Sequence, residues 1–543
     1  MQIITGDELR RQVKELHVED YRKRFLYQDL DRYFNTRPQR RLCVLYGLRR
    51  TGKTVMIHQK LNELNQYDKS MYILGQRGDS AGDLYQAIRE HPEMQYIFVD
   101  EATRFEGFIN TCSVLADHSL FAGEDRRIVL SGTDSLGFAV ARGDELLDRA
   151  DLIHTTYIPY VEYEYLLGKD IDDYISYGGT LTPESPFYNR EDTAEYTNSA
   201  IVHNITHTLE EWDEGRHYGA LSAIWGNGDL ESYINRVLEY HARTFVAKVI
   251  NSRFKSHDLG SARQMMQTHM GGTLQEAPFK TEELRKSIME ALEIKDEHAA
   301  PANQQSLDAV TGFLKKLDLI YQPQGTDTYI FTQPGMRYCQ ATALIETLQG
   351  SGAMDQLNES QKRAFTKIID EDIRGRMLED IITIDLSIGP TRLDGWEASK
   401  YTTVGGEYDL VLSNYREGRS AVYEIKHSSE QDDRQTKHLK SKSLAQDFVH
   451  QYGTEIVKKG VIYNGATLPE QDGIQYINIS DFLKEPGKYL YKEKVQDISQ
   501  IPSKSQDQRP DLKALLSKAE TKVTTQKQQD IGPHKPAELT PGE

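Results

Sequence analysis

The feature that most constrains the fold is the run GLRRTGKT at residues 47–54, which fits the pattern GxxxxGK[ST]. An apolar run, LCVLY (42–46), precedes it, and a helical stretch, VMIHQKLNEL (55–64), follows it. This context favours a P-loop over the alternative, a glycine turn with an exposed lysine. Glycines at both ends let the backbone bend so that successive N–H groups point inward and hold phosphates. The sequence therefore predicts a nucleoside-triphosphate site.

Each position of the loop has an expected role in holding ATP. Lys53 is expected to reach the β- and γ-phosphates, and the hydroxyl of Thr54 is expected to coordinate Mg²⁺. Backbone amides hold other phosphate oxygens, because anions bind at the N-terminus of a helix. The residues predicted to bind the nucleotide are Gly47, Leu48, Arg49, Arg50, Thr51, Gly52, Lys53 and Thr54.

The second element of the predicted site is the run YIFVDEAT, in which four apolar residues form a buried strand. Asp100 stands at the C-terminal end of that strand, where ligands of open α/β sheets bind. We expect Asp100 to contact the nucleotide and to hold the Mg²⁺ shell. Glu101 is the predicted general base, since a carboxylate there can polarise the attacking water. The alternative is an ordinary strand end with solvated acids.

Further catalytic candidates follow the next apolar run, IVLSG (128–132). Ser131 is the first choice for a contact with the γ-phosphate and Thr133 the second, with a β-turn of small residues as the alternative. ATPases also use an arginine to neutralise transition-state charge, often from a neighbouring subunit or domain. Arg142 and Arg149 are candidates, although each taken alone fits a solvated surface arginine better.

The apolar runs alternate with helical stretches between residues 41 and 167, which indicates an α/β domain with a parallel sheet. Two more predicted strands are MYIL (71–74) and IHTTYI (153–158). We assign residues 36–167 to a P-loop ATPase domain. Residues 1–35 are charged and contain the amphipathic run RKRFLYQDLDRYF, so they are predicted to form an N-terminal helical segment.

At 543 residues the chain is too long for one core, and the remainder divides into four parts. Residues 168–275 are predicted to be a helical region without recognisable chemistry, interrupted by a loop-like, Tyr-rich segment at 171–200. Residues 276–345 have the order helix, helix, β wing of a winged-helix module, with TYIFT (328–332) as the short strand. Residues 355–495 are predicted to form a second α/β domain. The polar tail at 497–543 is predicted to be disordered.

A second set of charged residues lies in the run GGEYDLVLSNYREGRSAVYEIK at 405–426. Glu424 and Lys426 share one face of a strand, and Asp409 can meet them across a hairpin. Glu379 lies on a helical stretch upstream. Carboxylates such as Asp409 and Glu424 bind Mg²⁺, which activates water, and a lysine can orient that water or neutralise charge. A solvated hairpin face is the alternative.

The N-terminal features together resemble the prokaryotic AAA-type ATPases of the archaeal-ATPase group. The stretch DRADLIHTTYIPYVEYEYLLG adds to the resemblance, because Arg149, Pro159 and Glu164 match the arginine, proline and acidic-aromatic helix of that family. Asp148 stands where the family usually has glycine. The resemblance implies the ASCE type of P-loop fold, with an extra strand between the two motif strands. MYIL (71–74) is the candidate for that strand.

The C-terminal set resembles the restriction-endonuclease-like PD-(D/E)xK fold. GRMLED, EYDLV, YEIKHS and GVIYNG look like its landmarks and place Glu379, Asp409, Glu424 and Lys426 in the motif. Many ATPases of the archaeal-ATPase group end in such a domain after a winged helix. The resemblance thus implies a nuclease-like domain, although a fold does not guarantee its chemistry.

We therefore expect an ATPase that uses ATP and Mg²⁺, with hydrolysis coupled to a nuclease-like domain that acts on DNA or RNA. One alternative is a nucleotide-dependent switch or regulator whose C-terminal domain binds but does not cleave; another is a chaperone-like ATPase. The net charge of −18 argues against nonspecific nucleic-acid binding by the whole surface. A local basic stretch remains, with Lys437, His438, Lys440 and Lys442.

Composition adds expectations about location. Cys43, Cys112 and Cys339 are scattered without a CxxC pair, which favours reduced thiols. No stretch approaches the roughly 20 apolar residues of a membrane helix. The N-terminal residues lack the apolar core of a signal peptide. We expect a cytoplasmic protein without membrane contact, with a homo-oligomer as one source of the catalytic arginine.

Overall fold

The computed structural model describes residues 1–36, 41–76, 78–108, 115, 121, 126–133, 149–155, 157–181, 195–209, 219–228, 230–255, 281–292, 304–323 and 329–491. Cys112, Arg142 and the tail at 497–543, predicted to be disordered, lie outside these residues. Within them, no helix has the length and apolar character needed to cross a membrane.

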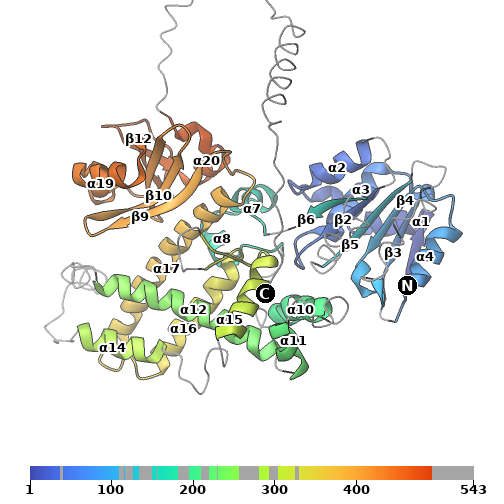
Figure 1. Ribbon diagram of the computed structural model, residues 1–543, viewed down its shortest axis with the longest axis horizontal. Coiled ribbons are helices and arrows are strands. Elements are labelled where there is room, and N and C mark those ends of the chain that lie inside the picture. The colour runs from blue at the N-terminus through green and yellow to red at the C-terminus, as the bar shows by residue number, and fades with distance from the viewer. Residues whose placement is uncertain are drawn as a thin grey trace, which may run out of the picture. The chain divides into compact units, whose positions relative to one another are not determined.

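A six-stranded sheet forms the N-terminal part of the chain, in the order β1-β3-β4-β5-β2-β6 (Figure 1). β1 runs antiparallel to β3, and all the other neighbours are parallel. The central strands are apolar and buried almost throughout, as parallel strands covered on both faces must be. The strands are β1 (Gln2–Thr5), β2 (Leu42–Tyr46), β3 (Ser70–Leu74), β4 (Tyr96–Asp100), β5 (Arg127–Gly132) and β6 (Ala150–His154).

Helices cover both faces of this sheet, because alternate residues of each strand point to opposite sides. Cys43 and Leu45 of β2 pack in a cluster with side chains from α1, α2 and α3. Leu42 and Val44 pack on the other face with side chains from α4. The bounds of these helices are α1 (Gly6–Glu15), α2 (Tyr27–Asn35), α3 (Lys53–Leu64) and α4 (Ala81–Glu90).

The strand between the two motif strands differs from the sequence prediction. β5 pairs with both β4 and β2 and so separates them, whereas MYIL (71–74), in β3, pairs with β4 on its other side. The prediction that MYIL forms the strand between the two motif strands is therefore wrong. The error arises because β3 lies between β2 and β4 along the chain, while β5, which follows both in sequence, lies between them in space.

The two ends of the predicted domain also differ. The helical segment predicted for residues 1–35 begins instead with β1, whose apolar residues extend the sheet alongside β3. The strand predicted at residues 153–158 is β6 at Ala150–His154, so it begins and ends earlier. The side chain of Asp151 in β6 is partly exposed and accepts a hydrogen bond from Arg41. A charged residue of this kind interrupts the apolar run by which a buried strand is recognised in a sequence.

Helices dominate the described residues that follow β6. α8 occupies the start of the segment predicted to be loop-like at 171–200, and residues 182–194 of that segment lie outside the described part. The long helix α12 lies within residues 168–275, which were predicted to be helical. The elements are α7 (Tyr160–Leu167), α8 (Ile171–Tyr177), a π-helical turn (Thr197–Val202), α10 (His203–Thr208), α11 (Gly219–Gly226) and α12 (Leu230–Lys255).

Two helices, a short hairpin and a third helix come next. β7 and β8 form an antiparallel pair of two residues each, directly after α15. The sequence predicted two helices and one short strand at 328–332 for this part of the chain; β8 lies within that strand, and β7 was not predicted. The bounds are α14 (Thr281–Leu292), α15 (Gln304–Lys316), β7 (Ile320–Tyr321), β8 (Ile330–Phe331) and α16 (Pro334–Gly350).

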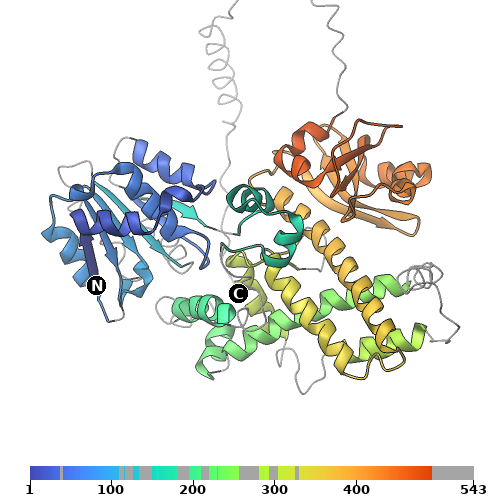
Figure 2. The same ribbon diagram turned by 180° about the vertical axis from the view of Figure 1, so that it is seen from behind.

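A five-stranded sheet in the order β13-β12-β11-β10-β9 forms the C-terminal part of the described chain (Figure 2). β9, β10 and β11 are antiparallel, and β11, β12 and β13 are parallel. α17 and α20 contribute to the apolar cluster on one face, and α18 and α19 to that on the other. The bounds are α17 (Glu359–Ser387), β9 (Glu397–Thr403), β10 (Gly406–Asn414), β11 (Arg419–Lys426), α18 (Lys437–Lys440), α19 (Lys442–Tyr452), β12 (Glu455–Tyr463), β13 (Gln475–Asn478) and α20 (Ile479–Lys484).

A buried carboxyl joins the end of α17 to the segment before α7. Asp385 is 1% exposed, and it accepts from the Tyr160 amide (3.2 Å) and the Tyr157 hydroxyl (3.3 Å). Burial raises the pKa of Asp385 to about 7, although both hydrogen bonds act against the rise. The folded chain therefore binds this proton more tightly than the unfolded chain does.

Asp385→Asn should stabilise the protein at alkaline pH. A carboxyl whose pKa is raised on folding costs stability as the pH rises from about 4 to about 7, and the full cost remains above that. The variant should therefore match the native chain near pH 4 and exceed it by about 2–4 kcal/mol near pH 8. Thermal melts between pH 4 and pH 8 measure this, with exposed Asp394→Asn as the control. Parallel pH profiles of the native chain and Asp385→Asn would contradict the prediction.

Candidate functional site

The P-loop joins β2 to α3 and contains two glycines in conformations that other residues avoid. Gly47 has a φ of 145° and Gly52 a φ of 89°. A Cβ on Gly47 would lie 2.3 Å from the carbonyl oxygen of Thr155, so only glycine fits beside the end of β6. The Thr51 hydroxyl donates to the Leu48 carbonyl (2.8 Å) and to Thr155 Oγ1 (2.9 Å). The protein itself therefore fixes the curve of the loop.

Lys53 begins α3 and points back toward the loop. Its Nζ donates to the carbonyl oxygens of Gly47 (2.9 Å) and Leu48 (2.7 Å), and the residue is only 9% exposed. A buried ammonium needs such acceptors, because removing a charge from water is costly. The ammonium is thus held against the loop backbone, close to where phosphates bind in a P-loop.

The outer residues of the loop contact other parts of the chain. Leu48 is buried in a cluster that includes Tyr196. The Tyr196 hydroxyl donates to the Arg49 carbonyl (3.2 Å), and the Leu181 amide donates to the Arg50 carbonyl (2.9 Å). The predicted nucleotide residues Leu48, Arg49 and Arg50 therefore fix the loop through these contacts, which the sequence did not reveal.

Thr54 and Asp100 lie side by side, as a shared Mg²⁺ shell requires. The Thr54 hydroxyl donates to Asp100 Oδ2 (2.8 Å), and the Tyr72 hydroxyl donates to the same oxygen (2.9 Å). Asp100 is 2% exposed at the end of β4. A hydroxyl and a carboxylate are the oxygen ligands that Mg²⁺ takes beside nucleotide phosphates. Tyr72, which holds the carboxylate in place, was not predicted from the sequence.

Glu101 and Ser131 end neighbouring strands at the same edge of the sheet. Glu101 has a φ of 53°, a backbone conformation that costs a non-glycine residue energy and is common at functional sites. Its carboxylate is partly exposed and forms an ion pair with Arg104 at 3.8 Å. Ser131 is buried and follows Leu130, which pairs with Val99 of β4. Ser131 is therefore level with Asp100 on the neighbouring strand, and Glu101 follows Asp100 directly in the chain.

A buried ion pair that was not predicted from the sequence contacts the backbone of the loop. The guanidinium of Arg24 binds both carboxylate oxygens of Glu162 in α7 at 2.8 Å each. The same group donates to the Thr51 carbonyl (2.7 Å), and its aliphatic carbons lie near Gly52. Arg24 is 5% exposed and Glu162 is 2% exposed. Glu164, the acid matched in the resemblance, instead accepts from Ser480 (2.7 Å).

The structure does not bring Arg149 to the P-loop of its own chain. Arg149 precedes β6, and its carbonyl accepts from the Leu42 amide at the start of β2 (2.8 Å). Because β2 and β6 are parallel, this is the edge of the sheet opposite the P-loop. Arg142, the other candidate, lies outside the described residues.

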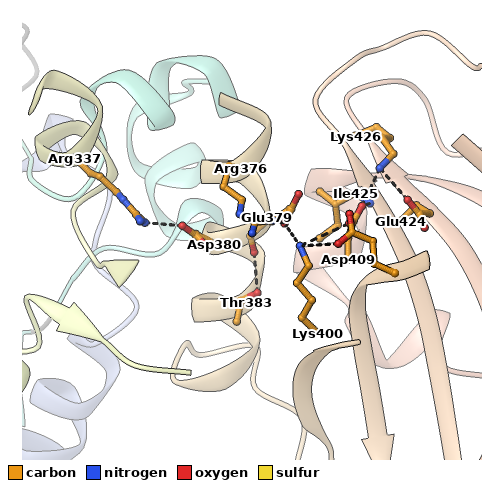
Figure 3. A network of polar contacts seen from close by, with 11 residues as sticks. Arg337, Arg376, Glu379, Asp380, Thr383, Lys400, Asp409, Glu424, Ile425 and Lys426 are labelled. Atoms are coloured by element: carbon orange, nitrogen blue, oxygen red, sulfur yellow. Dashed lines mark hydrogen bonds and ion pairs between the residues drawn. The ribbon is translucent and has the colours of Figure 1, made fainter. Parts of the chain in front are cut away.

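Asp409, Glu424 and Lys426 converge on neighbouring strands of the C-terminal sheet (Figure 3). Lys426 Nζ lies 2.8 Å from Asp409 Oδ2 and 2.9 Å from Glu424 Oε2. The Ile425 amide also donates to Asp409 Oδ2 (2.9 Å). The hairpin of β10 and β11 produces this arrangement, since Leu410 pairs with Tyr423. The structure thus brings these three predicted residues together.

Glu379 joins this cluster through a lysine that the sequence analysis missed. Lys400 on β9 donates to Glu379 Oε2 (2.9 Å) and lies 4.0 Å from Asp409 Oδ1 (Figure 3). Arg376, one turn before Glu379 in α17, also binds Glu379 Oε2 (2.7 Å). The sequence analysis predicted no strand at β9, and the contact of Lys400 with a distant helix could not be seen from the sequence.

Burial and charge set opposite pKa shifts within the cluster. Burial, with the Asp409 carboxylate, raises the pKa of Glu379, and the same causes raise that of Glu424 to about 8. Burial also disfavours ionised Asp409, but Lys426 and Lys400 outweigh it, and the pKa of Asp409 is lowered. Of Asp409 and Glu424, Asp409 is therefore the carboxyl that stays ionised, and Glu424 is the one that binds a proton more readily.

One oxygen of Glu424 suggests an additional ligand. Glu424 Oε1 is buried without a hydrogen-bond partner, and His438 Nδ1 lies 3.4 Å away. Leaving a buried acceptor unsatisfied costs about 1–3 kcal/mol, so a cation there would be stabilising. Within the described ranges, no group of three or more His, Cys, Asp or Glu side chains is placed to hold a metal.

Comparison with known families identifies the N-terminal α/β domain. Residues 39–164 match the model of a family described as an AAA domain. The match includes the P-loop, β4 and most of α7, and the parallel sheet agrees with a P-loop NTPase fold. No curated protein matches the chain. Residues 39–164 thus form an AAA-type P-loop ATPase domain, and such domains use ATP with Mg²⁺.

Proposed function

We propose that this chain couples ATP hydrolysis to a nuclease-like C-terminal domain that acts on DNA or RNA. The observation that carries the proposal is the convergence of Asp409, Glu424 and Lys426, with one carboxylate oxygen of Glu424 left without a partner. An AAA domain in the same chain supplies the ATPase. The proposed modules are a winged helix at 276–345 and a PD-(D/E)xK domain at 355–495.

In the proposed ATPase reaction, the loop amides and Lys53 hold the phosphates, and Thr54 and Asp100 hold Mg²⁺. The bound Mg²⁺ neutralises charge on the phosphates. Glu101 orients and deprotonates the attacking water, for which its partly exposed carboxylate is suited. Ser131 contacts the γ-phosphate from the neighbouring strand. Arg149 would serve only in a neighbouring copy, since it lies at the far edge of its own sheet.

In the proposed nuclease reaction, Asp409 and Glu424 hold a divalent ion, which activates water and stabilises a phosphate transition state when bound. Lys426 orients that water or neutralises the developing charge, because its ammonium already lies between the two carboxylates. Glu379 adds a third acid through Lys400.

The nucleic acid itself would meet local basic surfaces. Lys437, Lys440 and Lys442 are exposed at α18 and the start of α19, beside the His438 that approaches Glu424. These lysines can bind backbone phosphates. Because the net charge is −18, binding would be confined to such patches and would weaken as salt increases.

A nucleotide-dependent switch or regulator is the second candidate, and one observation favours it. Lys400 and Lys426 already form ion pairs with Glu379, Asp409 and Glu424. A domain whose acids are compensated by lysines could bind a partner without cleaving it.

Lys53→Ala should weaken ATP binding by at least about tenfold. The variant removes the buried cation that meets the phosphates, and a hydrogen bond to a charged group is worth about 1.5–3 kcal/mol. Isothermal titration with ATP and Mg²⁺ measures the change. The exposed Lys69→Ala in the same domain is the matched control. Unchanged affinity in Lys53→Ala would overturn the assignment of the P-loop lysine.

Glu101→Gln should still bind ATP but turn it over about 100-fold more slowly or worse, because the amide cannot accept the proton of water. Phosphate release with ATP and Mg²⁺ measures turnover, and titration checks binding. The exposed Glu106→Gln on the same loop should behave like the native chain. Full turnover by Glu101→Gln would show that another residue is the base.

Lys426→Ala should reduce nucleic-acid cleavage by about 100-fold or more, since one stabilising charge at the reacting phosphate has an effect of this size. Plasmid DNA, single-stranded DNA and RNA should be offered with Mg²⁺ or Mn²⁺, with and without ATP. Exposed Lys488→Ala is the control, and thermal melts confirm that each variant folds.

The same assay separates the two candidate functions. Cleavage that requires both Lys426 and Lys53 would support ATP-gated nuclease activity. Cleavage that persists in Lys53→Ala would mean that the nuclease does not depend on ATP. No cleavage of any substrate, with ATPase activity intact, would reject the nuclease and favour the switch.

A further inference from the structure

Two hydroxyls hold the carboxylate of Asp100, and only one of them belongs to the motifs of the nucleotide site. Thr54 ends the P-loop motif, whereas Tyr72 lies in β3, outside both motifs. Both hydroxyls donate to Asp100 Oδ2, at 2.8 Å from Thr54 and 2.9 Å from Tyr72. Asp100 is 2% exposed, and a buried carboxylate is costly unless hydrogen bonds compensate its charge. The Tyr72 hydroxyl therefore supplies a bond that this carboxylate needs.

The register of the sheet explains how Tyr72 reaches Asp100. β3 and β4 are parallel neighbours (Figure 1), in which Leu74 is level with Asp100 and Tyr72 is level with Phe98. Side chains two residues apart in a strand share a face, so Tyr72 lies on the same face as Asp100 and two residues before its level. At about 3.3 Å per residue, the hydroxyl has to cross roughly 7 Å along the strand. A phenol ring spans that distance and ends in a donor.

Packing fixes the direction of this donor. Tyr72 is 3% exposed and belongs to the apolar cluster that includes side chains from α1, α2 and α3. The centre of its ring lies 4.9 Å from the centre of the His58 ring. His58 follows Thr54 by about one turn of α3, and its Nδ1 lies 2.8 Å from the Thr54 carbonyl oxygen. The same histidine therefore contacts both residues whose hydroxyls bind Asp100.

The two donors differ in their tasks when Mg²⁺ binds. Thr54 Oγ1 is itself a proposed Mg²⁺ ligand, whereas Tyr72 has no proposed contact with the metal and acts on the carboxylate alone. The other oxygen, Asp100 Oδ1, accepts from the Glu101 amide (3.1 Å). Groups that hydrogen-bond to a metal-binding side chain orient it, and their loss typically lowers metal affinity 10–100-fold. The hydroxyl of Tyr72 has the place of such a group.

We propose that Tyr72 is a positioning residue of the ATPase, which aims the carboxylate of Asp100 and thereby sets how strongly Mg²⁺ increases the affinity for ATP. The inference rests on the proposed function, in which Thr54 and Asp100 hold Mg²⁺. Tyr72 is assigned no contact with the nucleotide. Binding of the phosphates without metal, by the loop amides and Lys53, therefore does not depend on its hydroxyl.

Tyr72→Phe tests this role, because it removes the hydroxyl and keeps the ring. The full chain is titrated calorimetrically with the non-hydrolysable ATP analogue adenylyl imidodiphosphate, once with Mg²⁺ and once with EDTA. The ratio of the two affinities is the gain that the metal provides. Tyr72→Phe should reduce this gain by about tenfold and leave the affinity in EDTA within about twofold of the native value. A gain reduced by less than about threefold would overturn the proposal.

Tyr33→Phe is the matched control for a lost buried hydroxyl. Tyr33 is 4% exposed and lies in the same apolar cluster, and its hydroxyl donates to the Arg41 carbonyl (2.9 Å) just before β2, at the edge of the sheet opposite the P-loop. Tyr33→Phe should melt at a lower temperature than the native chain but keep the full gain from Mg²⁺. An equal loss of the gain in both variants would mean that general destabilisation is the cause, and would overturn the role of Tyr72.

Asp100→Asn separates this inference from the proposed function on which it rests. A gain that is lost in Asp100→Asn but kept in Tyr72→Phe rejects only the positioning role of Tyr72. A gain from Mg²⁺ that is absent in the native chain, or unchanged in Asp100→Asn, rejects the proposed metal site and the role of Tyr72 with it. A gain that is lost in Asp100→Asn and reduced in Tyr72→Phe supports both.

Discussion

The buried pair of Arg24 and Glu162 is the contact on which the nucleotide site depends. It joins the segment before α2, the P-loop and α7, which are far apart in sequence, because one guanidinium binds Glu162 twice and the Thr51 carbonyl once. Removing one partner of such a pair leaves an uncompensated buried charge and costs about 3–5 kcal/mol. The order of the phosphate-binding loop therefore depends on this ion pair. Because both partners of the pair lie outside the eight-residue motif, the motif needs the rest of the domain around it.

The C-terminal cluster differs from the nucleotide site because it buries several acids close together. Burial raises the pKa of Glu379 and of Glu424, and repulsion from the Asp409 carboxylate raises both further. Lys400 and Lys426 reduce the repulsion by placing ammonium groups between the acids. The same ion pairs are compatible with a nuclease site that binds a metal ion and with a site that binds a partner without cleaving it. The geometry therefore supports both proposed roles of the domain, and only the unpartnered oxygen of Glu424 favours the nuclease.

The sequence could predict what depends on local pattern. β2 and β4 have the bounds that their apolar runs predicted, and the hairpin placed Asp409 beside Glu424 and Lys426. The sequence could not predict contacts between segments that are far apart along the chain. Glu162 and Glu164 both fit an acidic-aromatic helix, and only the folded chain shows which acid faces Arg24. The spatial place of β5 was missed for the same reason, since strand order in a sheet is not strand order along the chain.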